Sequence, residues 1–341
     1  MRRVTVWVLV VLAGVALAAP AGGQGLTRVK FSYFPAFHTM TVMVASGLDL
    51  FRQEGLDVEM IQASSGALQP IQLISGEVDL TTVGLENVVA LRREGKLTTH
   101  IYVLVKRMSQ DFVVRNEALR ARGVTPQDPI ERRLAALRGM RIGYTLPNAP
   151  TDRYARYYLQ KAGLVPGRDA EMVQVGSPTS LVGAIRQGRI DAFMLTPPTP
   201  QLVELDGIGT ILIYGTRGDV RELDNYPYTG LSVRTEWARR NRDTLVRFVR
   251  ALHRARQLIA ADRERSLQAL RRFFPQMEER ALRAGYEAMV PALSEDGSLD
   301  QATVKRFLDL GFEIGLLTGT RPSDREGVLW TNEFVRLARG R

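Results

Sequence analysis

The segment Asp57–Gly66 reads DVEMIQASSG, and a related segment, DAEMVQVGSP, stands 112 positions further along the chain at Asp169–Pro178. The same offset aligns Gly76 of SGEVDL with Gly188 of QGRIDA, in the phrases that follow the two segments. A phrase that returns twice at one spacing indicates two units of similar construction. We therefore expect two lobes that share one order of strands and helices.

The composition agrees with two lobes. The chain has 341 residues, of which 45% are hydrophobic and 24% are charged, as in ordinary globular proteins. This length exceeds the size at which a single hydrophobic core stops growing. The net charge of +10 could indicate nucleic-acid binding, but the arginines of Arg239–Arg272 alternate with apolar residues at helical spacing. That pattern favours a solvated helix face, and we expect no nucleic-acid partner.

The first 24 residues have the organisation of a secretory signal peptide. A basic start, Met1–Arg3, precedes the apolar run Val4–Leu17 and the small residues Ala18 and Ala19. An uncleaved membrane anchor is the alternative, but the run is shorter than the ~20 residues that a spanning helix needs. The chain also contains no cysteine that could carry a lipid. The sequence thus predicts a free periplasmic protein without a lipid anchor.

Residues 29–214 alternate short strands with short helices in two passes. In the first pass we expect strands at 29–33, 57–62, 78–83, 101–105 and 112–115, and helices at 39–54, 67–75 and 86–94. Gly55, Gly76 and Gly95 follow these helices as left-handed stops. In the second pass we expect strands at 141–145, 171–175, 191–195 and 210–214, and helices at 151–162, 179–187 and 201–205.

From Gly230 onward the pattern becomes helical. The apolar residues Leu245, Val249, Leu252 and Ile259 mark one long amphipathic helix, and further helices are expected at 267–274, 278–289, 301–317 and 333–339. No third sheet is expected, so this tail should pack on one of the lobes.

Strands that alternate with helices imply βαβ units, which build parallel sheets. The expected fold class is α/β, with two mainly parallel sheets flanked by helices, a two-strand hinge and a helical C-terminal tail. The expected division is a signal peptide at 1–24, a first lobe at 26–110 and 223–341, and a second lobe at 111–222. Two crossings between lobes make a hinge, which allows closure on a ligand.

The loops that follow the strands form the expected ligand site, because parallel sheets bind ligands beyond the carboxyl ends of their strands. Small hydroxyls and free backbone N–H groups in these loops suit a carboxylate, a sulfonate or a similar oxyanion. Aromatic side chains could form apolar walls. The candidate ligand-binding residues are Tyr33, Phe34, Pro35, His38, Ser64, Ser65, Gly66, Gly84, Pro147, Asn148, Ser177, Thr179, Thr196, Pro197, Tyr226 and Tyr228.

Each candidate also has a purely structural interpretation. Hydroxyls such as that of Ser177 stand where a helix begins and can simply cap it, and the aromatic residues can pack in the core. His38 can be a packed or solvated residue as readily as a ligand contact. Glu86 and Asp152 fall in first helical turns, where acidic residues oppose the helix dipole. If either carboxylate entered the cleft, it would oppose a purely anionic ligand.

Several phrases, taken in order, are similar to a known family: GLDLFRQEGLDVEMIQASSG, LISGEVDL, LRGMRIGY, AIRQGRIDA followed by TPP, and DRERSLQALRRFF. They resemble the nitrate/sulfonate/taurine-type (NMT1-like) substrate-binding proteins of ABC importers. The resemblance implies a type II periplasmic binding fold that carries a small solute to a membrane permease powered by an ATPase. It also implies ligand contacts in the loop after Tyr33, in Ser64–Gly66, at Pro147 and Asn148, and at Thr196 and Pro197.

The predicted function is periplasmic capture of a small organic or inorganic anion by lobe closure, by a monomer that delivers the solute to its permease. Two alternatives stay open: an enzyme on the same fold, such as the menaquinone-pathway enzymes, and a ligand sensor for a membrane partner. The sequence has no G-x-S-x-G segment, no histidine pair at metal-binding spacing and no P-loop. Gly207 and Gly209 begin a dinucleotide-binding phrase, but Leu212 occupies the position of its third glycine. We therefore expect no catalytic residue, no metal ligand and no cofactor.

Overall fold

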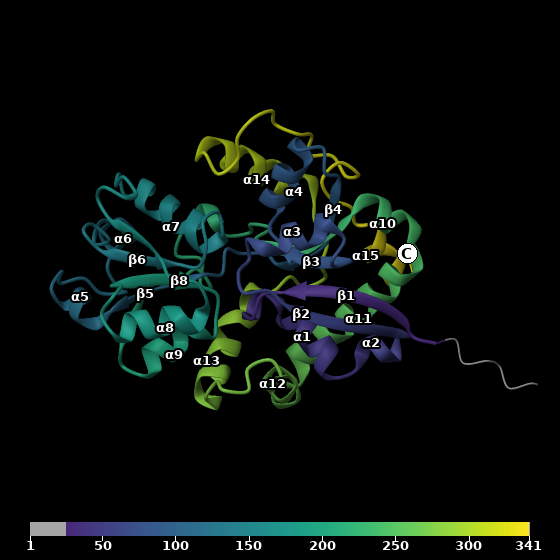
Figure 1. Cartoon of the computed structure of the whole chain (residues 1–341), viewed down its shortest axis with the longest axis horizontal. Coiled ribbons are helices and arrows are strands. Elements are labelled where there is room, and N and C mark those ends of the chain that lie inside the picture. The colour runs from purple at the N-terminus through teal and green to yellow at the C-terminus, as the bar shows by residue number, and fades with distance from the viewer. Residues whose placement is uncertain (1–24, 341) are drawn as a thin grey trace, which may run out of the picture.

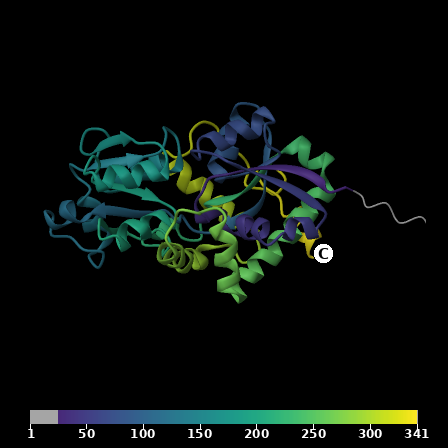
Figure 2. The same cartoon turned by 60° about the horizontal axis from the view of Figure 1, so that its bottom comes forward.

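The computed structural model describes residues 25–340, which form two lobes side by side (Figure 1). Each lobe is built around one five-stranded sheet. A view turned by 60° shows the same two bodies, with connecting segments and helices of the C-terminal part where they meet (Figure 2). The signal peptide expected at residues 1–24 lies outside the described residues.

The sheet of the first lobe has the strand order β2-β1-β3-β10-β4. Its strands are β1 (Thr27–Tyr33), β2 (Leu56–Gln62), β3 (Leu80–Val83), β4 (Thr98–Val105) and β10 (Thr229–Arg234). β1 is parallel to β2 and β3, whereas β10 lies antiparallel between β3 and β4. Isolated bridges from His100 to Trp330 and from Val105 to Leu293 cover the outer edge of β4 with the tail, which protects that edge from pairing with other chains.

The sheet of the second lobe repeats this order as β7-β6-β8-β5-β9. Its strands are β5 (Asp111–Arg115), β6 (Arg141–Tyr144), β7 (Glu171–Gln174), β8 (Ala192–Leu195) and β9 (Gly209–Ile213). β3 and β8 are separated by the same 112 positions as the repeated phrases, and the phrases themselves fall on the matching edge strands β2 and β7. The two similar lobes expected from the repeat are therefore present.

One strand in each sheet runs against the other four. These strands are β5 and β10, and each enters its sheet directly from a crossing between the lobes, at residues 106–110 and 214–228. Each sheet is thus mixed, with two parallel and two antiparallel pairings. The parallel βαβ units and the two crossings follow the sequence pattern, and the antiparallel strand arises because the chain returns from the opposite lobe.

Helices connect the strands in both lobes. The first lobe contains the 3-10 turn η1 (Phe37–Thr39), α1 (Met40–Gly47), α2 (Leu50–Gln53), α3 (Leu68–Ser75) and α4 (Leu85–Arg93). The second lobe contains α5 (Asn116–Arg120), α6 (Ile130–Ala135), α7 (Pro150–Lys161), α8 (Pro178–Arg186) and α9 (Thr199–Leu205), and η2 (Arg221–Leu223) lies in the second crossing. The single helix expected at residues 39–54 is wrong, because Asp49 has a left-handed φ of 56° and separates α1 from α2.

Strand β10 corrects the expectation that residues from 230 onward are helical. Its Leu231 and Val233 are fully buried, and the strand lies close enough to β4 that a Cβ atom on Gly230 would be 2.0 Å from His100 Nε2. The helical pattern begins only after Arg234.

The tail packs mainly on the first lobe. It contains α10 (Thr235–Arg240), α11 (Arg242–Ala261), α12 (Arg263–Arg271), α13 (Glu279–Met289), η3 (Val290–Ala292), α14 (Gln301–Glu313) and α15 (Glu333–Ala338). α11 lies along α1, and the ring of its Phe248 packs 5.9 Å from that of Phe31 and 4.5 Å from that of Phe51.

Helix α13 contacts both lobes, so the expectation that the tail packs on one lobe holds only in part. It packs on α9 of the second lobe, and Arg280 pairs with Asp206 at 2.8 Å. A Cβ atom on Gly285 would lie 2.6 Å from Pro198 Cβ and 3.2 Å from a ring carbon of Phe37. Both ribbon views place α13 at the junction of the lobes (Figures 1 and 2).

The carboxylate of Asp111 ties the two crossings together. Asp111 begins β5 after the first crossing, and its Oδ1 accepts hydrogen bonds from the N–H and the hydroxyl of Thr216 in the second crossing, at 3.0 and 2.8 Å. Gln201 donates to Oδ2 at 2.7 Å. Burial raises the pKa of Asp111 to about 6, although the bonds from Thr216 and Gln201 oppose this rise.

Because the pKa of Asp111 is higher in the folded than in the unfolded state, the folded state binds more protons between about pH 4 and 6. Stability from this group is present below that range and is lost as the pH rises through it. We expect the free energy of unfolding of Asp111→Asn, relative to that of the wild type, to rise by up to about 3 kcal/mol as the pH increases from 4 to 7. Urea unfolding at several pH values measures this difference. A stability difference that does not change with pH would contradict this assignment.

We expect Gly285→Ala to lower stability, because overpacking costs about 1–3 kcal/mol against the ~1 kcal/mol that alanine gains inside a helix. Gly183→Ala is the matched control, since Gly183 is also inside a helix but a Cβ atom there would have no neighbour within 4 Å. The midpoints of urea unfolding compare the variants. If Gly285→Ala and Gly183→Ala stabilised the protein equally, the space between position 285 and Pro198 would be large enough for a Cβ atom, and the prediction would be wrong.

Candidate functional site

A small, partly open cavity lies between the two lobes. Its volume is about 40 Å³, roughly three times the ~10–15 Å³ that one water molecule needs. Both lobes line it, with residues that follow or end their strands and begin the next helices. The lining residues are Phe34, His38, Gly66, Gln69, Thr82, Val83, Gly84, Glu86, Asn87, Tyr228 and Thr229 from the first lobe and the strand β10 region, Thr145, Pro150, Thr151, Leu195 and Thr196 from the second lobe, and Gln110 from the first crossing.

The carboxylate of Glu86 is the most unusual group of the cavity. Glu86 is only 2% exposed, at the start of α4. Its Oε1 accepts a hydrogen bond from Arg153 of α7 at 3.1 Å, and Arg153 also donates to Asn87 Oδ1 at 3.3 Å. Its Oε2 makes no hydrogen bond to any residue between 25 and 340. Burial raises the pKa of Glu86, and Arg153 lowers it in part.

Gly84 makes the position of this carboxylate possible. A Cβ atom on Gly84 would lie 2.1 Å from Glu86 Oε2, so a side chain at position 84 would displace the carboxylate. The glycine that ends β3 and the acid in the first turn of α4 therefore form one unit. Asp152, the other acid discussed above, does not line the cavity: it pairs with Arg156 at 2.6 Å and accepts from the Asn148 N–H at 2.9 Å.

His38 is held as a neutral ring beside the cavity. Burial lowers its pKa to about 4, so it carries no charge at neutral pH. Its ring stacks on Phe34 at 6.1 Å and meets Tyr228 edge-on at 6.5 Å. Its Nδ1 has no hydrogen-bond partner in the described part of the chain. Burial also raises the pKa of Tyr228, although Thr196 and Gln110 beside its hydroxyl lower it in part.

Other polar groups around the cavity are fixed by bonds to one another. Gln69 donates to Thr82 Oγ1 at 2.8 Å and to Thr81 Oγ1 at 3.1 Å. The hydroxyls of Thr145 and Thr151 lie 2.9 Å apart, and Ser65 Oγ lies 3.3 Å from Thr145 Oγ1. Rigid hydroxyls of this kind can orient a solute without moving.

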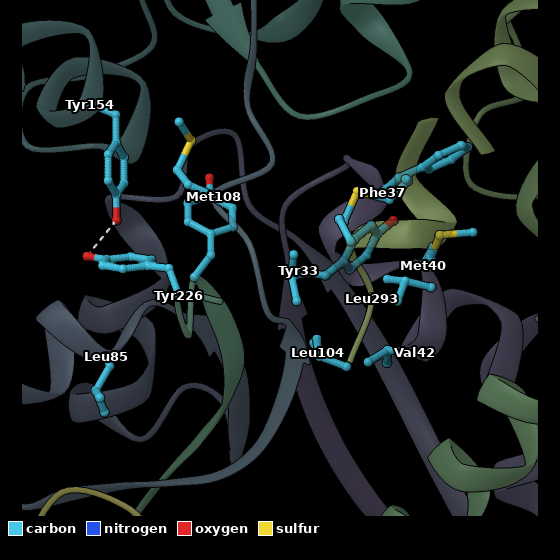
Figure 3. Close-up of a cluster of buried hydrophobic side chains, with 14 of the residues drawn as sticks. Tyr33, Phe37, Met40, Val42, Leu85, Leu104, Met108, Tyr154, Tyr226 and Leu293 are labelled. Atoms are coloured by element: carbon cyan, nitrogen blue, oxygen red, sulfur yellow. Dashed lines mark hydrogen bonds between the residues drawn. The ribbon is translucent and has the colours of Figure 1, made fainter. Parts of the chain in front are cut away.

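Hydrogen bonds across the interface hold the lobes closed. Besides the Glu86–Arg153 pair and the Ser65–Thr145 contact, the Phe37 N–H donates to the Pro197 carbonyl at 2.7 Å. Tyr154 of α7 donates to Tyr226 at 3.2 Å, as Figure 3 shows in a close-up of the buried side chains. Phe34 packs with Val113 and Leu195 in the apolar cluster of the second lobe, although it follows β1 of the first.

Six of the sixteen candidate residues line the cavity: Phe34, His38, Gly66, Gly84, Thr196 and Tyr228. The other ten lie near it or outside it. Ser65, Pro197 and Tyr226 make the contacts between lobes described above, Tyr33 packs edge-on against Phe273, and Pro35 is half-buried. Ser64, Pro147, Asn148 and Thr179 are exposed. Ser177 caps α8 by accepting from the Ser180 N–H at 3.2 Å, as the structural interpretation predicts.

Several lining residues do not belong to the predicted set. Six of the additional polar residues are Gln69, Thr82, Asn87, Gln110, Thr151 and Thr229, and Thr145 is a seventh. Glu86 also lines the cavity, so the condition under which the sequence argues against a purely anionic ligand is met. Polar residues that end a strand or enter a first helical turn are the signal that could have found them. Gln110 ends the first crossing between the lobes, and Thr229 directly follows the second. The spacing of residues in the sequence does not show that these crossings lie next to the loops that line the cavity.

Between residues 25 and 340 there is no group of three or more His, Asp or Glu side chains that could hold a metal ion. No helix in the same part of the chain is long and apolar enough to cross a membrane.

Two sheets of one strand order, two crossings and a polar cavity between the lobes define a two-lobed periplasmic binding fold. The model of the NMT1-like family matches residues 22–271, and the chain belongs to this family. The putative binding protein YtlA of Bacillus subtilis is 25% identical over 246 residues, covering 72% of this chain and 70% of YtlA.

Two further similar proteins carry names that specify a solute. The bicarbonate-binding protein CmpA of Synechococcus elongatus is 23% identical over 255 residues, covering 70% of this chain and 55% of CmpA. The chain thus matches only about half of CmpA. The crystal structure of the periplasmic nitrate-binding protein NrtA from Synechocystis PCC 6803 matches with a TM-score of 0.71 at 17% identity, covering 92% of this chain and 89% of NrtA. At this identity the likeness shows a shared fold.

We expect Arg153→Met to destabilise the protein, because it leaves Glu86 buried without a charged partner, a change that costs up to about 3–5 kcal/mol at a buried pair. The loss should shrink as the pH falls, since protonation removes the buried charge, whose pKa is already raised by burial. Urea unfolding measures both effects.

The double variant Glu86→Gln/Arg153→Met is the control for the Arg153 prediction. It removes both charges, so we expect it to regain most of the stability lost by Arg153→Met alone. A double variant as unstable as the sum of the two single variants would show that the pair is not coupled.

Proposed function

We propose that the protein is the solute-binding component of an ABC importer, which closes two lobes on a small solute and delivers it to a membrane permease. The observation that carries the proposal is the polar cavity between the lobes, to which both sheets contribute the loops beyond their strands. The names of YtlA, CmpA and NrtA describe binding proteins, which supports binding rather than catalysis.

The size of the cavity favours a small oxyanion as the solute. A volume of about 40 Å³ corresponds to roughly three water-sized groups, which suits a planar ion such as nitrate or hydrogen carbonate. The hydroxyls of Thr145, Thr151, Thr196 and Tyr228 offer hydrogen-bond donors to such an ion. CmpA and NrtA are named for bicarbonate and nitrate, respectively, and this supports the same class for the present protein.

The proposal extends to the residues, the compartment and the partners. The six cavity-lining candidates, Phe34, His38, Gly66, Gly84, Thr196 and Tyr228, contact the solute. The protein acts in the periplasm as a monomer after removal of the signal peptide, and its partner is a permease with its ATPase. NrtA is a periplasmic nitrate-binding protein by name, which supports the compartment.

A thermal-shift screen of nitrate, hydrogen carbonate and small sulfonates tests the proposal. A solute present at 100 times its dissociation constant adds about 2.7 kcal/mol of stability. Gly66→Trp should abolish the thermal shift. A Cβ atom on Gly66 would already lie 3.2 Å from Pro150 Cδ of the other lobe, so the larger indole ring should prevent the lobes from closing. Ser64→Trp is the matched control, since Ser64 is exposed and should bind the solute normally.

Small-angle scattering of the same two variants shows whether closure accompanies binding. Gly66→Trp should have a larger radius of gyration than Ser64→Trp, with and without solute. Equal radii together with unaltered binding by Gly66→Trp would remove the cavity from the mechanism. Chemical conversion of the solute by the purified protein would replace the binding role with an enzymatic one.

A further inference from the structure

The cavity contains acceptor atoms that no group of the described chain satisfies. Glu86 Oε2 and Gln110 Oε1 are buried and lack hydrogen-bond partners between residues 25 and 340, and both side chains line the cavity. A buried acceptor without a donor costs free energy. A solute that fills the cavity must therefore supply donors if the closed form is to be stable.

Of these acceptors, Glu86 has the more rigid position. Its Oε1 is bonded to Arg153, and Gly84 leaves the space in which Oε2 lies. Arg153 balances the charge of the carboxylate, and His38, which lines the same cavity, is neutral. Within residues 25–340, no lysine or arginine lines the cavity beside Glu86, whose Oε2 is an acceptor without a donor. Repulsion between Oε2 and an acceptor-only anion would be strong in this desolvated position.

We infer that Glu86 is a specificity-determining residue, which selects a solute that donates an O–H or N–H hydrogen bond to its Oε2. This inference rests on the proposed function and narrows it. Among planar oxyanions of the right size, hydrogen carbonate carries one hydroxyl, whereas nitrate has only acceptor oxygens. The cavity of this protein is therefore built for a hydrogen-carbonate-like solute and rejects nitrate.

A protonated Glu86 is the competing arrangement, because a neutral carboxyl group could donate to an acceptor-only anion. Arg153 and Asn87 both donate to Glu86 Oε1, and the Glu86 backbone N–H also lowers the pKa of the carboxyl. The hydroxyls of Tyr154, Tyr226 and Tyr228 lie close enough that the charge of Glu86 raises their pKa. The ion pair with Arg153 favours the ionised form and opposes the effect of burial. The two arrangements differ in a measurable way, since binding through a protonated Glu86 strengthens as the pH falls.

Isothermal titration of nitrate and hydrogen carbonate, in mildly alkaline buffer, tests the inference on the wild type. The two ions match in charge and shape and differ in one donor. We expect hydrogen carbonate to bind at least about tenfold more tightly, which is the loss for an unmatched hydrogen bond to a charged group.

Glu86→Gln should reverse the preference. Arg153 continues to require an acceptor, so the amide oxygen faces Arg153 and the amide N–H group takes the place of Oε2 in the cavity. Nitrate then meets a donor and should bind at least about tenfold more tightly than it binds the wild type. Glu222→Gln is the control, because Glu222 also bonds a residue of α7, Lys161, at 2.7 Å but does not line the cavity.

The outcomes separate the two proposals. Nitrate binding to the wild type as tightly as hydrogen carbonate, or tightening as the pH falls, would overturn the role of Glu86 and leave the importer function intact. If Glu86→Gln kept the wild-type preference for hydrogen carbonate over nitrate, the role of Glu86 would likewise be overturned and the importer function would remain intact. Binding of neither ion to the wild type would overturn the assignment of a planar oxyanion as the solute, and the inference would fall with it.

Discussion

The ion pair between Glu86 and Arg153 joins the two lobes beside the cavity that lies between them. A carboxylate that is 2% exposed is tolerated in a protein interior only when it is paired. Here the partner comes from the other lobe, so the charge is balanced only when the lobes are closed. The same carboxylate keeps one oxygen free at the cavity. Closure and the proposed contact with the solute therefore depend on one side chain.

The fold could be predicted from the sequence because its decisive signal is local and repeated. The phrase around Asp57 and its counterpart at Asp169 mark equivalent edge strands, and Gly76 and Gly188, both with positive φ, end equivalent helices. Strand β10 was not predicted, because its extended conformation depends on pairing with β3 and β4, which are distant in sequence. A segment of six residues with two buried apolar side chains could be a strand or the start of a helix. The break at Asp49 was also not predicted, because a left-handed φ at a residue other than glycine has no clear signal in the sequence.

The site could be predicted only in part, for a different physical reason. Strand ends identify loops, and the loop residues His38, Gly66 and Thr196 do line the cavity. Spacing does not say which way a loop side chain points: Ser64 is exposed while its neighbour Ser65 is buried against Thr145. The role of Glu86 depends on Gly84, on Arg153 from another lobe and on desolvation, and none of these is visible in a linear pattern.

The contact between α9 and α13 joins the two lobes, and neither helix lines the cavity. Separation of the lobes would require this contact to open. Gly285 rests on Pro198, and the half-exposed Arg280 holds Asp206 of the opposite lobe. A membrane partner that touches only this contact could tell a loaded receptor from an empty one without reaching the buried cargo.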